Sequence, residues 1–252
     1  MKLYDLTQKI GVSTPPWPTY EPLELKYFKR LSTERVNGQI IKTSNHIGTH
    51  LDGERHFWTA GRDMASIPLE ELFGEGVVVD LSDAVGDYDI YTSKMIEERV
   101  DVKENDILII HTGYHHYGWD QPEADEEKYF MKHPGPNMEF AKWCIEKDIK
   151  WIGVDCGSAD HPMNTVCRKL RPDLAEECEE HLGKPLDEVF SHDESRQLMH
   201  TQLFPEGIIH AENIGGEIDE LLNQRVKIGF FPWKGVDMES SIGRCVAFVE
   251  EE

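Results

Sequence analysis

The segment SNHIGTHLDGERHFW, residues 44–58, decides how this part of the chain folds and what it can bind. It brings three histidines and one aspartate within eleven positions, namely His46, His50, Asp52 and His56. Imidazole nitrogens and carboxylate oxygens are usual protein ligands of zinc and manganese. One histidine alone is more often a structural residue, but four candidate ligands at this spacing are rarely a coincidence. The segment therefore predicts a metal site.

The spacing of these side chains excludes regular secondary structure through the whole segment. In a straight strand His46 and His50 would lie about 13 Å apart, at roughly 3.3 Å per residue, too far to share an ion whose bonds are about 2 Å long. In a helix the two histidines would share a face, but Asp52 would point about 200° away from His50. Gly48 and Gly53 permit the backbone angles of a curl, so we predict a glycine-hinged loop.

The four side chains also suggest different roles. Two neutral imidazoles and one carboxylate suit zinc or manganese, and the two oxygens of Asp52 could bridge two ions. His56 is then left over. An imidazole has an ordinary pKa of about 6.5, so a histidine beside a metal-bound water suits general acid and base catalysis. We therefore predict His56 as the catalytic residue.

The rest of the chain predicts a mixed α/β fold. Apolar residues make up 39% of the 252 residues, enough for one sizeable core, and we predict a single domain over residues 1–252. Runs rich in β-branched or aromatic residues predict strands at 2–10, 77–81, 107–111, 151–156, 208–211, 226–231 and 245–249. Helices are expected over 93–100 with Ser93 as the cap, over 138–147 with Asn137 as the cap, and over 218–222.

A charged, helix-forming excursion from the sheet is expected over residues 164–197. Its part RPDLAEECEEHLGKPLDEVF, residues 171–190, predicts a helix that stops at Gly183 and restarts at Pro185. The many glutamates are typical of a solvated face, although a segment of this size also suits a pocket roof or an oligomer contact.

The charge of the chain bears on its partners. The formal charge of −22, from 48 acidic and 26 basic residues, has the wrong sign for binding nucleic acid or an anionic membrane. No stretch approaches the roughly 18 apolar residues of a membrane span, and MKLYDLTQKI lacks the apolar run of a signal peptide. The five cysteines include no Cys-x-x-Cys pair, so neither a disulfide framework nor a zinc finger is indicated. We expect a cytoplasmic location.

The run HIGTHLDGERHF, residues 46–57, resembles the signature of the bacterial cyclase family, which includes kynurenine formamidase, isatin hydrolase and trans-dienelactone hydrolase. Downstream, the family pattern has a histidine followed twelve residues later by a glutamate, which His200 and Glu212 match. Trp17 matches a substrate-contacting tryptophan of the formamidase branch. The similarity extends to HTG at 111–113, GVDCGSAD at 153–160 and FPWKGVDMESSIGR at 231–244.

The resemblance implies a swivelling β/β/α-type fold, with a mixed central sheet and flanking helices. It implies two metal positions that share one carboxylate: His46, His50 and Asp52 for the first, and Asp52, His200 and Glu212 for the second. Zinc is expected first and manganese is the alternative, as one or two ions. Family members resemble dimers or tetramers, so the resemblance also implies a homodimer or homotetramer.

The resemblance further implies a hydrolase that acts on a small molecule. A metal-bound water would attack a carbonyl carbon, and His56 would pass a proton to the leaving nitrogen or oxygen. Our first choice of substrate is N-formylkynurenine, because Trp17 could stack on its aromatic ring. The alternatives are a cyclic substrate such as isatin, a cyclic imide or a dienelactone, and a non-hydrolytic metal-binding module of the same fold.

Two residues close to the motifs leave alternatives open. His210 lies two positions before Glu212 and would share its side of a strand, which makes His210 the rival of His200 for a metal position. Glu54 stands where the family commonly has proline, so an extra carboxylate lies near the site.

Other polar residues near strand ends favour simpler interpretations. His111, His115 and His116 follow a strand end without ligand spacing, so we expect no direct catalytic role for them. Asp155 and Asp160 could accept hydrogen bonds from site residues or form turns, and turn formation is the favoured interpretation.

Overall fold

A closed β-barrel is the centre of the fold. Within residues 1–190 and 196–250, which the computed structural model describes, seven strands from β12 to β4 form the ring in the order β12, β11, β5, β7, β9, β10 and β4. The ring closes because β4 also pairs with β12, and β1 pairs with the other end of β12. The bounds are β1 Lys2–Asp5, β4 His50–Asp52, β5 Phe73–Asp80, β7 Ile107–His111, β9 Trp151–Val154, β10 Ile209–Glu212, β11 Gln224–Pro232 and β12 Ser240–Val249.

The sheet is mixed in direction, as predicted. β5, β7, β9 and β10 are parallel neighbours, whereas β1, β4, β11 and β12 pair antiparallel. Parallel strands that are buried on both faces have continuous apolar runs, and β7 begins with four buried aliphatic residues, Ile107 to Ile110. The predicted α/β fold with a mixed central sheet is confirmed.

Side chains alternate between two cores along these strands. Ile107 and Ile109 of β7 pack with Trp151 of β9 in an apolar cluster that fills the barrel. Every strand of the ring contributes at least one side chain to this cluster. Leu108 and Ile110 point the other way and pack against helices. The barrel therefore has an apolar interior and a helix-covered outer face.

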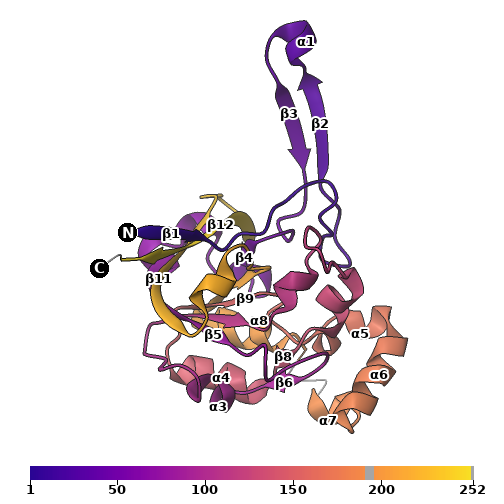
Figure 1. Ribbon diagram of the computed structural model, residues 1–252, viewed down its shortest axis with the longest axis vertical. Coiled ribbons are helices and arrows are strands. Elements are labelled where there is room, and N and C mark those ends of the chain that lie inside the picture. The colour runs from indigo at the N-terminus through magenta and orange to yellow at the C-terminus, as the bar shows by residue number, and fades with distance from the viewer. Residues whose placement is uncertain (191–195, 251–252) are drawn as a thin grey trace.

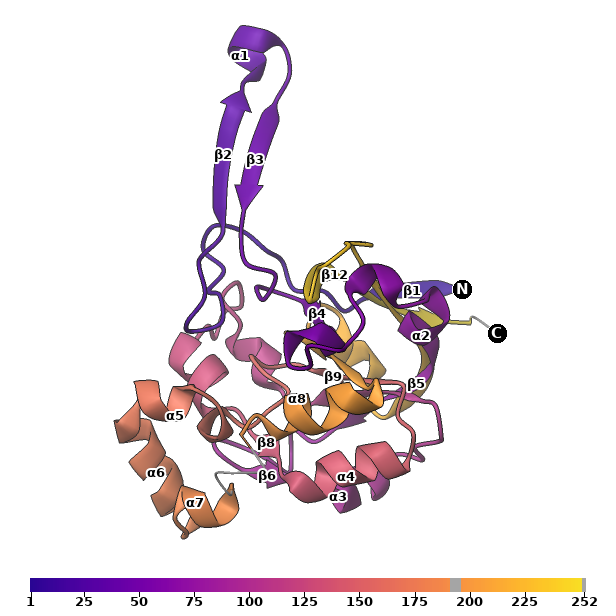
Figure 2. The same cartoon turned by 180° about the vertical axis from the view of Figure 1, so that it is seen from behind.

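Helices cover part of the outer face. α3, α4 and α8 lie together against the barrel, and α5, α6 and α7 form a separate flank (Figures 1 and 2). The bounds are α1 Leu31–Glu34, α2 Leu69–Leu72, α3 Ser93–Glu97, α4 Met138–Glu146, α5 Cys167–Leu170, α6 Pro172–Leu182, α7 Leu186–Val189 and α8 Leu198–Leu203. Short 3-10 turns include η1 Glu54–His56, η2 Met64–Ser66, η3 Tyr114–Tyr117, η5 Pro162–Asn164, η6 Phe204–Glu206 and η7 Ile218–Leu221, and η4 Lys128–Lys132 is a π-helical turn.

A long β-hairpin projects from the body of the molecule (Figures 1 and 2). It consists of β2 Glu24–Lys29 and β3 Gly38–Lys42, with α1 at its tip. All six residues of β2 are exposed. Neither strand was predicted, because the apolar side chains lie on both faces of the hairpin and leave no alternation to detect. A separate short pair joins β6 Ile90–Tyr91 to β8 Gly135–Pro136.

The local predictions have mixed outcomes. The strand predicted at 107–111 is confirmed in full, whereas the one predicted at 2–10 ends at Asp5. Asn137 caps α4 by accepting a hydrogen bond from the Phe140 N–H, as predicted. Ser93 is not the cap of α3, because Thr92 occupies that position.

The excursion over 164–197 is helical, as expected, and residues 191–195 lie outside the described residues. α6 ends at Gly183, whose φ of +65° is the left-handed conformation that glycine favours, and α7 begins after Pro185. A single domain over 1–252 stays a prediction. In the described ranges no helix is long and apolar enough to cross a bilayer.

Candidate active site

Two neighbouring strands supply the polar side chains of the candidate active site. β4 places His50 and Asp52 on the outer face of the barrel, because they alternate with Leu51 of the interior core. β10 places His210 and Glu212 on the same outer face. The antiparallel register sets His210 opposite Asp52 and Glu212 opposite His50, and opposed side chains lie about 5 Å apart. The sheet itself therefore gathers two imidazoles and two carboxylates.

A curl before β4 brings His46 to the same place. Gly48 has a φ of +56°, a left-handed conformation that glycine adopts without strain. His46 Nδ1 consequently lies 2.8 Å from Asp52 Oδ1. The predicted hinge is confirmed at Gly48. The hinge expected at Gly53 is wrong, because its φ of −96° is a conformation that any residue can adopt. Glycine fits there because a Cβ atom would lie only 2.3 Å from Met64 Cε.

The hydrogen bonds of His50 leave one ring nitrogen available as a ligand. Its Nδ1 donates to the carbonyl oxygen of Gly48 at 2.8 Å, so the lone pair is on Nε2. Among the described residues that buried Nε2 has no hydrogen-bond partner, although it lies 3.4 Å from Asp52 Oδ1 and 3.6 Å from Glu212 Oε2. Burial lowers the pKa of His50 to about 4, which keeps the ring neutral. A buried lone pair that faces two carboxylates fits a cation between them.

His200 enters from α8 and is oriented by a carboxylate. Its Nδ1 donates to Asp160 Oδ2 at 2.6 Å, so Nε2 faces the site, 3.5 Å from Asp52 Oδ2 and 3.7 Å from Glu212 Oε1. Asp160 also accepts a bond from the Met199 N–H at 2.9 Å. A histidine whose second nitrogen is held by a carboxylate is typical of metal sites. The favoured interpretation of Asp160 as a turn former is therefore wrong, because Asp160 positions His200.

Two buried carboxylates stand side by side in the site. Glu212 Oε1 accepts hydrogen bonds from the Ala159 N–H at 2.7 Å and from Ser158 Oγ at 3.2 Å. Burial and the negative charge of Asp52 together raise the pKa of Glu212 to about 8. Burial also opposes the charge of Asp52, but neighbouring histidines outweigh it and hold the pKa of Asp52 well below its ordinary value. Near neutrality Asp52 is thus charged and Glu212 mostly protonated, and a cation between them would stabilise the charged form of both.

Glu239, which the sequence did not single out, joins His46 to His56. His56 Nδ1 lies 2.8 Å from Glu239 Oε2, and His46 Nε2 lies 3.0 Å from the same oxygen. Burial would raise the pKa of Glu239, but its bonds to the two histidines lower it to about 2. Burial would lower the pKa of His46, but Asp52 and Glu239 outweigh burial and raise it to about 10. The sequence carried only a weak signal of this contact, because Glu239 lies in the segment 231–244, far along the chain from both histidines.

The two residues left open by the sequence have distinct positions. Both ring nitrogens of the buried His210 lack a hydrogen-bond partner within the described part of the chain, and burial holds its pKa well below the ordinary value. His210 is thus neutral and able to act as a ligand beside His200, its ring centroid 4.9 Å away. Glu54 is buried, but its carboxylate accepts bonds from Arg62 Nε at 2.8 Å and from the Arg62 N–H at 2.9 Å. Arg62, and not the metal cluster, is the partner of Glu54.

A small pocket opens onto these side chains. Trp17 lines it, partly buried and in edge-to-face contact with Phe130 at 6.3 Å between ring centroids. Tyr20, another residue the sequence analysis missed, has its ring centroid 5.1 Å from that of His46. The pocket is lined by Trp17, Tyr20, His46, Asp52, His56, Ser158, Gln197, His200 and Glu212.

Three overlapping groups in this site hold ligand atoms close enough for one ion. Within each group the atoms lie within 4.8 Å of one another. The groups are His46, Asp52 and His56; His50, Asp52 and Glu212; and His200, His210 and Glu212. The structure and the sequence motif thus point to the same part of the molecule as suited to a divalent metal ion. In addition to the five predicted ligands, His56 and His210 belong to these groups.

The chain is similar in sequence to proteins of one family. A family model named Cyclase and described as "Putative cyclase" matches residues 4–161. Cyclase-like protein 1 of Arabidopsis thaliana is 31% identical over 169 residues, which cover 61% of this chain and 61% of the plant protein. Kynurenine formamidase of Erythrobacter litoralis is 26% identical over 162 residues, covering 63% of this chain and 68% of that enzyme.

The similarity of fold extends over nearly the whole chain. Isatin hydrolase A from Ralstonia solanacearum superposes with a TM-score of 0.79 at 18% identity, covering 99% of this chain and 92% of that one. An isatin hydrolase bound to the product analogue thioisatinate superposes with a TM-score of 0.76 at 18% identity, covering 99% and 93%. The expected fold is therefore confirmed, including the part beyond residue 161 that carries His200 and Glu212.

Proposed function

Because the chain belongs to the Cyclase family, we propose that it is a metal-dependent hydrolase that cleaves an amide or lactone bond of a small molecule. The observation that carries the proposal is the pair of buried carboxylates, Asp52 and Glu212, which lie 3.4 and 3.6 Å from the buried Nε2 of His50. His46 and His200 complete the set of proposed ligands. The ligand atoms are imidazole nitrogens and carboxylate oxygens, which suit zinc first and manganese as the alternative.

The protein side chains supply proton transfer. A bound divalent ion would lower the pKa of a coordinated water and polarise the carbonyl of the substrate. Glu239 holds Nδ1 of His56, so Nε2 is the nitrogen free to exchange protons with substrate. His56 is 13% exposed and lines the pocket, so it can reach the leaving nitrogen or oxygen. We assign His56 the acid–base role.

The proposed first substrate is N-formylkynurenine. Trp17 and Tyr20 at the pocket place two aromatic rings where an aromatic substrate could stack. Two relatives that match 63% and 62% of this chain are named kynurenine formamidase, and this supports the same choice. Isatin, a cyclic imide or a dienelactone is the alternative, and the fold similarity to isatin hydrolases favours isatin among these.

A non-hydrolytic metal-binding module is the candidate from a different class. The position of His56 argues against it, because this histidine lines the pocket beside the proposed ligands, where a hydrolase needs an acid–base group and a module that only binds metal needs none.

The hairpin supports a homo-oligomer, which we propose as a dimer or tetramer. An isolated two-stranded hairpin is marginally stable in water. The hairpin nevertheless exposes large apolar side chains, among them Phe28 at 55% and Ile40 at 54%. Residues 24–42 hold five basic and two acidic residues, whereas the whole chain carries a net charge of −22. A basic, apolar arm on an acidic protein complements the body of a second copy of the chain.

The experiment that tests the function combines metal analysis with a substrate panel. Wild type, Asp52→Ala and His181→Ala are loaded with zinc or manganese, dialysed and assayed on N-formylkynurenine, isatin, a cyclic imide and a lactone. His181 is a half-exposed histidine that bonds to Asp89 and lies outside the proposed site, so its variant controls for the effect of an alanine substitution elsewhere in the chain. Turnover of one substrate by wild type and His181→Ala, with no metal and no turnover in Asp52→Ala, supports the hydrolase. Metal binding by wild type without turnover of any substrate supports the binding module instead.

A further inference from the structure

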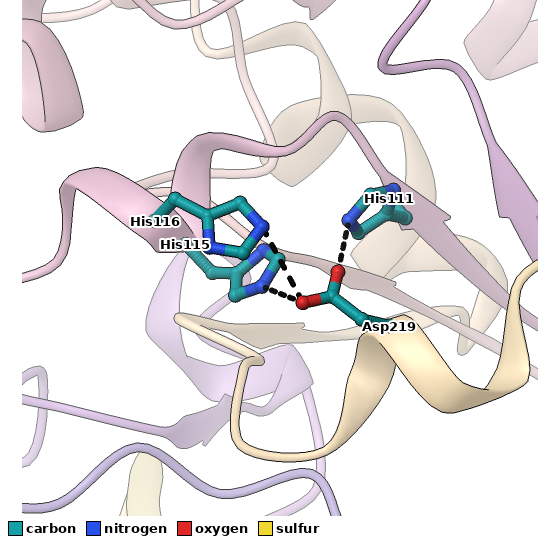
Figure 3. A group of neighbouring side chains, drawn as sticks. All are labelled: His111, His115, His116 and Asp219. Atoms are coloured by element: carbon teal, nitrogen blue, oxygen red, sulfur yellow. Dashed lines mark hydrogen bonds and ion pairs between the residues drawn. The ribbon is translucent and has the colours of Figure 1, made fainter. Parts of the chain in front are cut away.

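A second cluster of histidines lies at the carboxyl end of β7, away from the proposed active site (Figure 3). His111 is the last residue of β7, His115 and His116 belong to η3, and Asp219 comes from η7. We propose that these four side chains form a separate structural site for zinc or a similar transition-metal ion.

The distances between the ligand atoms fit such an ion. Asp219 Oδ1 lies 3.2 Å from His111 Nε2, and Asp219 Oδ2 lies 3.4 Å from Nε2 of both His115 and His116. In a tetrahedral zinc site with bonds of about 2.0 Å, neighbouring ligand atoms are about 3.3 Å apart. Figure 3 shows the three rings turned toward the Asp219 carboxylate. All four ligand atoms lie within 4.8 Å of one another.

One of these nitrogens is buried and has no hydrogen-bond partner. His111 is 2% exposed, and its Nδ1 is held by Asp80 Oδ1 at 2.8 Å, so Nε2 is the nitrogen turned toward Asp219. Among the described residues this Nε2 makes no hydrogen bond, although Asp219 Oδ1 is 3.2 Å away. The two atoms are close but poorly aligned for an N–H···O bond, as two ligands of one ion would be.

Carboxylates hold the opposite sides of the rings. Asp80 lies directly across the β5–β7 ladder from His111. His115 Nδ1 lies 3.2 Å from Asp155 Oδ2, and Asp155 is fixed by the N–H groups of Thr112 at 2.9 Å and Gly113 at 2.8 Å. Carboxylates that bind the second nitrogen of a histidine orient it for a metal. The favoured interpretation of Asp155 as only a turn former is therefore wrong.

This cluster and the proposed active site lie on opposite faces of the sheet. Alternate residues of a strand point to the same face, so the side chain of His111 lies on the same side of β7 as those of Ile107 and Ile109, which fill the barrel. Glu212 alternates with Ala211, which also fills the barrel, so Glu212 points outward. One ion cannot serve both places, and the second site is independent of the proposed hydrolase function.

The ligand set indicates the ion and its effect. Three imidazoles and one carboxylate favour zinc, cobalt, nickel or copper over calcium or magnesium. Four protein ligands leave no position for a substrate, which is typical of structural zinc. The side chains of His116 and Asp219 are 48% and 45% exposed, so an ion can enter from solvent. By joining β7, η3 and η7, it would close one end of the barrel and stabilise the folded state.

The test counts zinc ions per chain in the full-length protein and uses zinc alone as the probe. Wild type, Asp219→Ala, Asp52→Ala and the double variant are stripped with a chelator, titrated calorimetrically and analysed for metal after dialysis. Glu220→Ala, which removes the neighbouring exposed carboxylate, is the matched control. We expect Asp219→Ala to bind one zinc fewer than wild type and Glu220→Ala. Asp52→Ala should retain one zinc that the double variant loses.

Two further readouts do not depend on catalysis. Zinc should raise the Tm of Asp52→Ala by several degrees and leave the Tm of the double variant unchanged. Bound cobalt should give Asp52→Ala the visible absorption of a tetrahedral Co²⁺ site, and this absorption should disappear in Asp52→Ala/His116→Ala. His116 is half-exposed, so this second variant tests the site even if Asp219→Ala fails to fold. Equal zinc content in Asp219→Ala and wild type, or no zinc in Asp52→Ala, would overturn the proposal and leave the cluster as a histidine–aspartate hydrogen-bonding network.

Discussion

Asp160 accepts the Nδ1 hydrogen of His200 at 2.6 Å, and this bond turns Nε2 of His200 toward Asp52 and Glu212. Both partners are buried, so water does not compete for the bond. The orientation of a proposed metal ligand therefore depends on a residue that is not among those lining the pocket.

Replacing Asp160 by Asn should consequently weaken metal binding. An amide at this position can donate as well as accept, so it no longer selects the ring orientation, and losses of about 10- to 100-fold in affinity accompany such changes. Zinc affinity measured by chelator competition checks the prediction. Asp155→Asn makes the equivalent change beside His115 of the second cluster, so it is the control and should leave the affinity of the proposed active site unchanged. An affinity equal to that of wild type in Asp160→Asn would refute the positioning role.

Metal binding at the proposed active site should release protons and strengthen as pH rises. Burial would lower the pKa values of His46 and His200, but neighbouring carboxylates raise both to about 10, so both rings are protonated near neutrality without metal. A metal ligand must give up its proton, so affinity increases about tenfold per pH unit for each proton displaced. Calorimetry at pH 7.5 in buffers of different ionisation enthalpy measures the release. Zinc binding without proton release contradicts this assignment of ligands.

Acid should destabilise the fold through a histidine outside both clusters. His161 is fully buried, and burial lowers its pKa to about 3, whereas in the unfolded chain it titrates near 6.5. Between these values the unfolded state binds more protons, so the free energy of unfolding falls as pH drops below about 6.5. The loss is about 2 kcal/mol by pH 5.

Urea unfolding of wild type and His161→Gln at pH 7 and pH 5 checks this prediction. The variant is expected to lose less stability between the two pH values than wild type, whatever its stability at pH 7. An identical loss in both proteins would assign the acid sensitivity to other groups.

The hairpin should govern the oligomeric state. Phe28→Ser/Ile40→Ser removes two exposed apolar side chains, and we expect a lower mass by size exclusion with light scattering. Gln39→Ser, a polar position on the same hairpin opposite Tyr27, is the control and should keep the mass of wild type. A wild-type mass equal to one chain, or one that the double substitution leaves unchanged, argues against the hairpin as the contact.

The sequence predicted what is local and missed what depends on distant contacts. His46, His50, Asp52 and His56 lie in one run, so their spacing alone revealed the cluster and the curl at Gly48. Glu239 reaches the same place from the segment before β12, and no spacing rule connects it to His56.

The same reason explains the histidines after β7. Their spacing matches no regular ligand motif, because the 3-10 turn η3 folds His115 and His116 back toward His111, and the fourth candidate ligand, Asp219, lies more than a hundred positions away. The buried strands β7, β9 and β10 were predicted well because continuous apolar runs mark them, whereas the predictions at 77–81 and 245–249 found only the second halves of β5 and β12. β4 was not predicted, since its three residues are too few to show a period.

The most direct test of the central claim is the effect of His56→Gln on turnover at full metal occupancy. The substitution removes the proposed acid–base group and leaves His46, His50, Asp52, His200 and Glu212 in place. We predict that His56→Gln binds as much metal as wild type and that its kcat on the best substrate is lower by about 10²- to 10⁴-fold. A kcat equal to that of wild type at equal metal content would contradict the account.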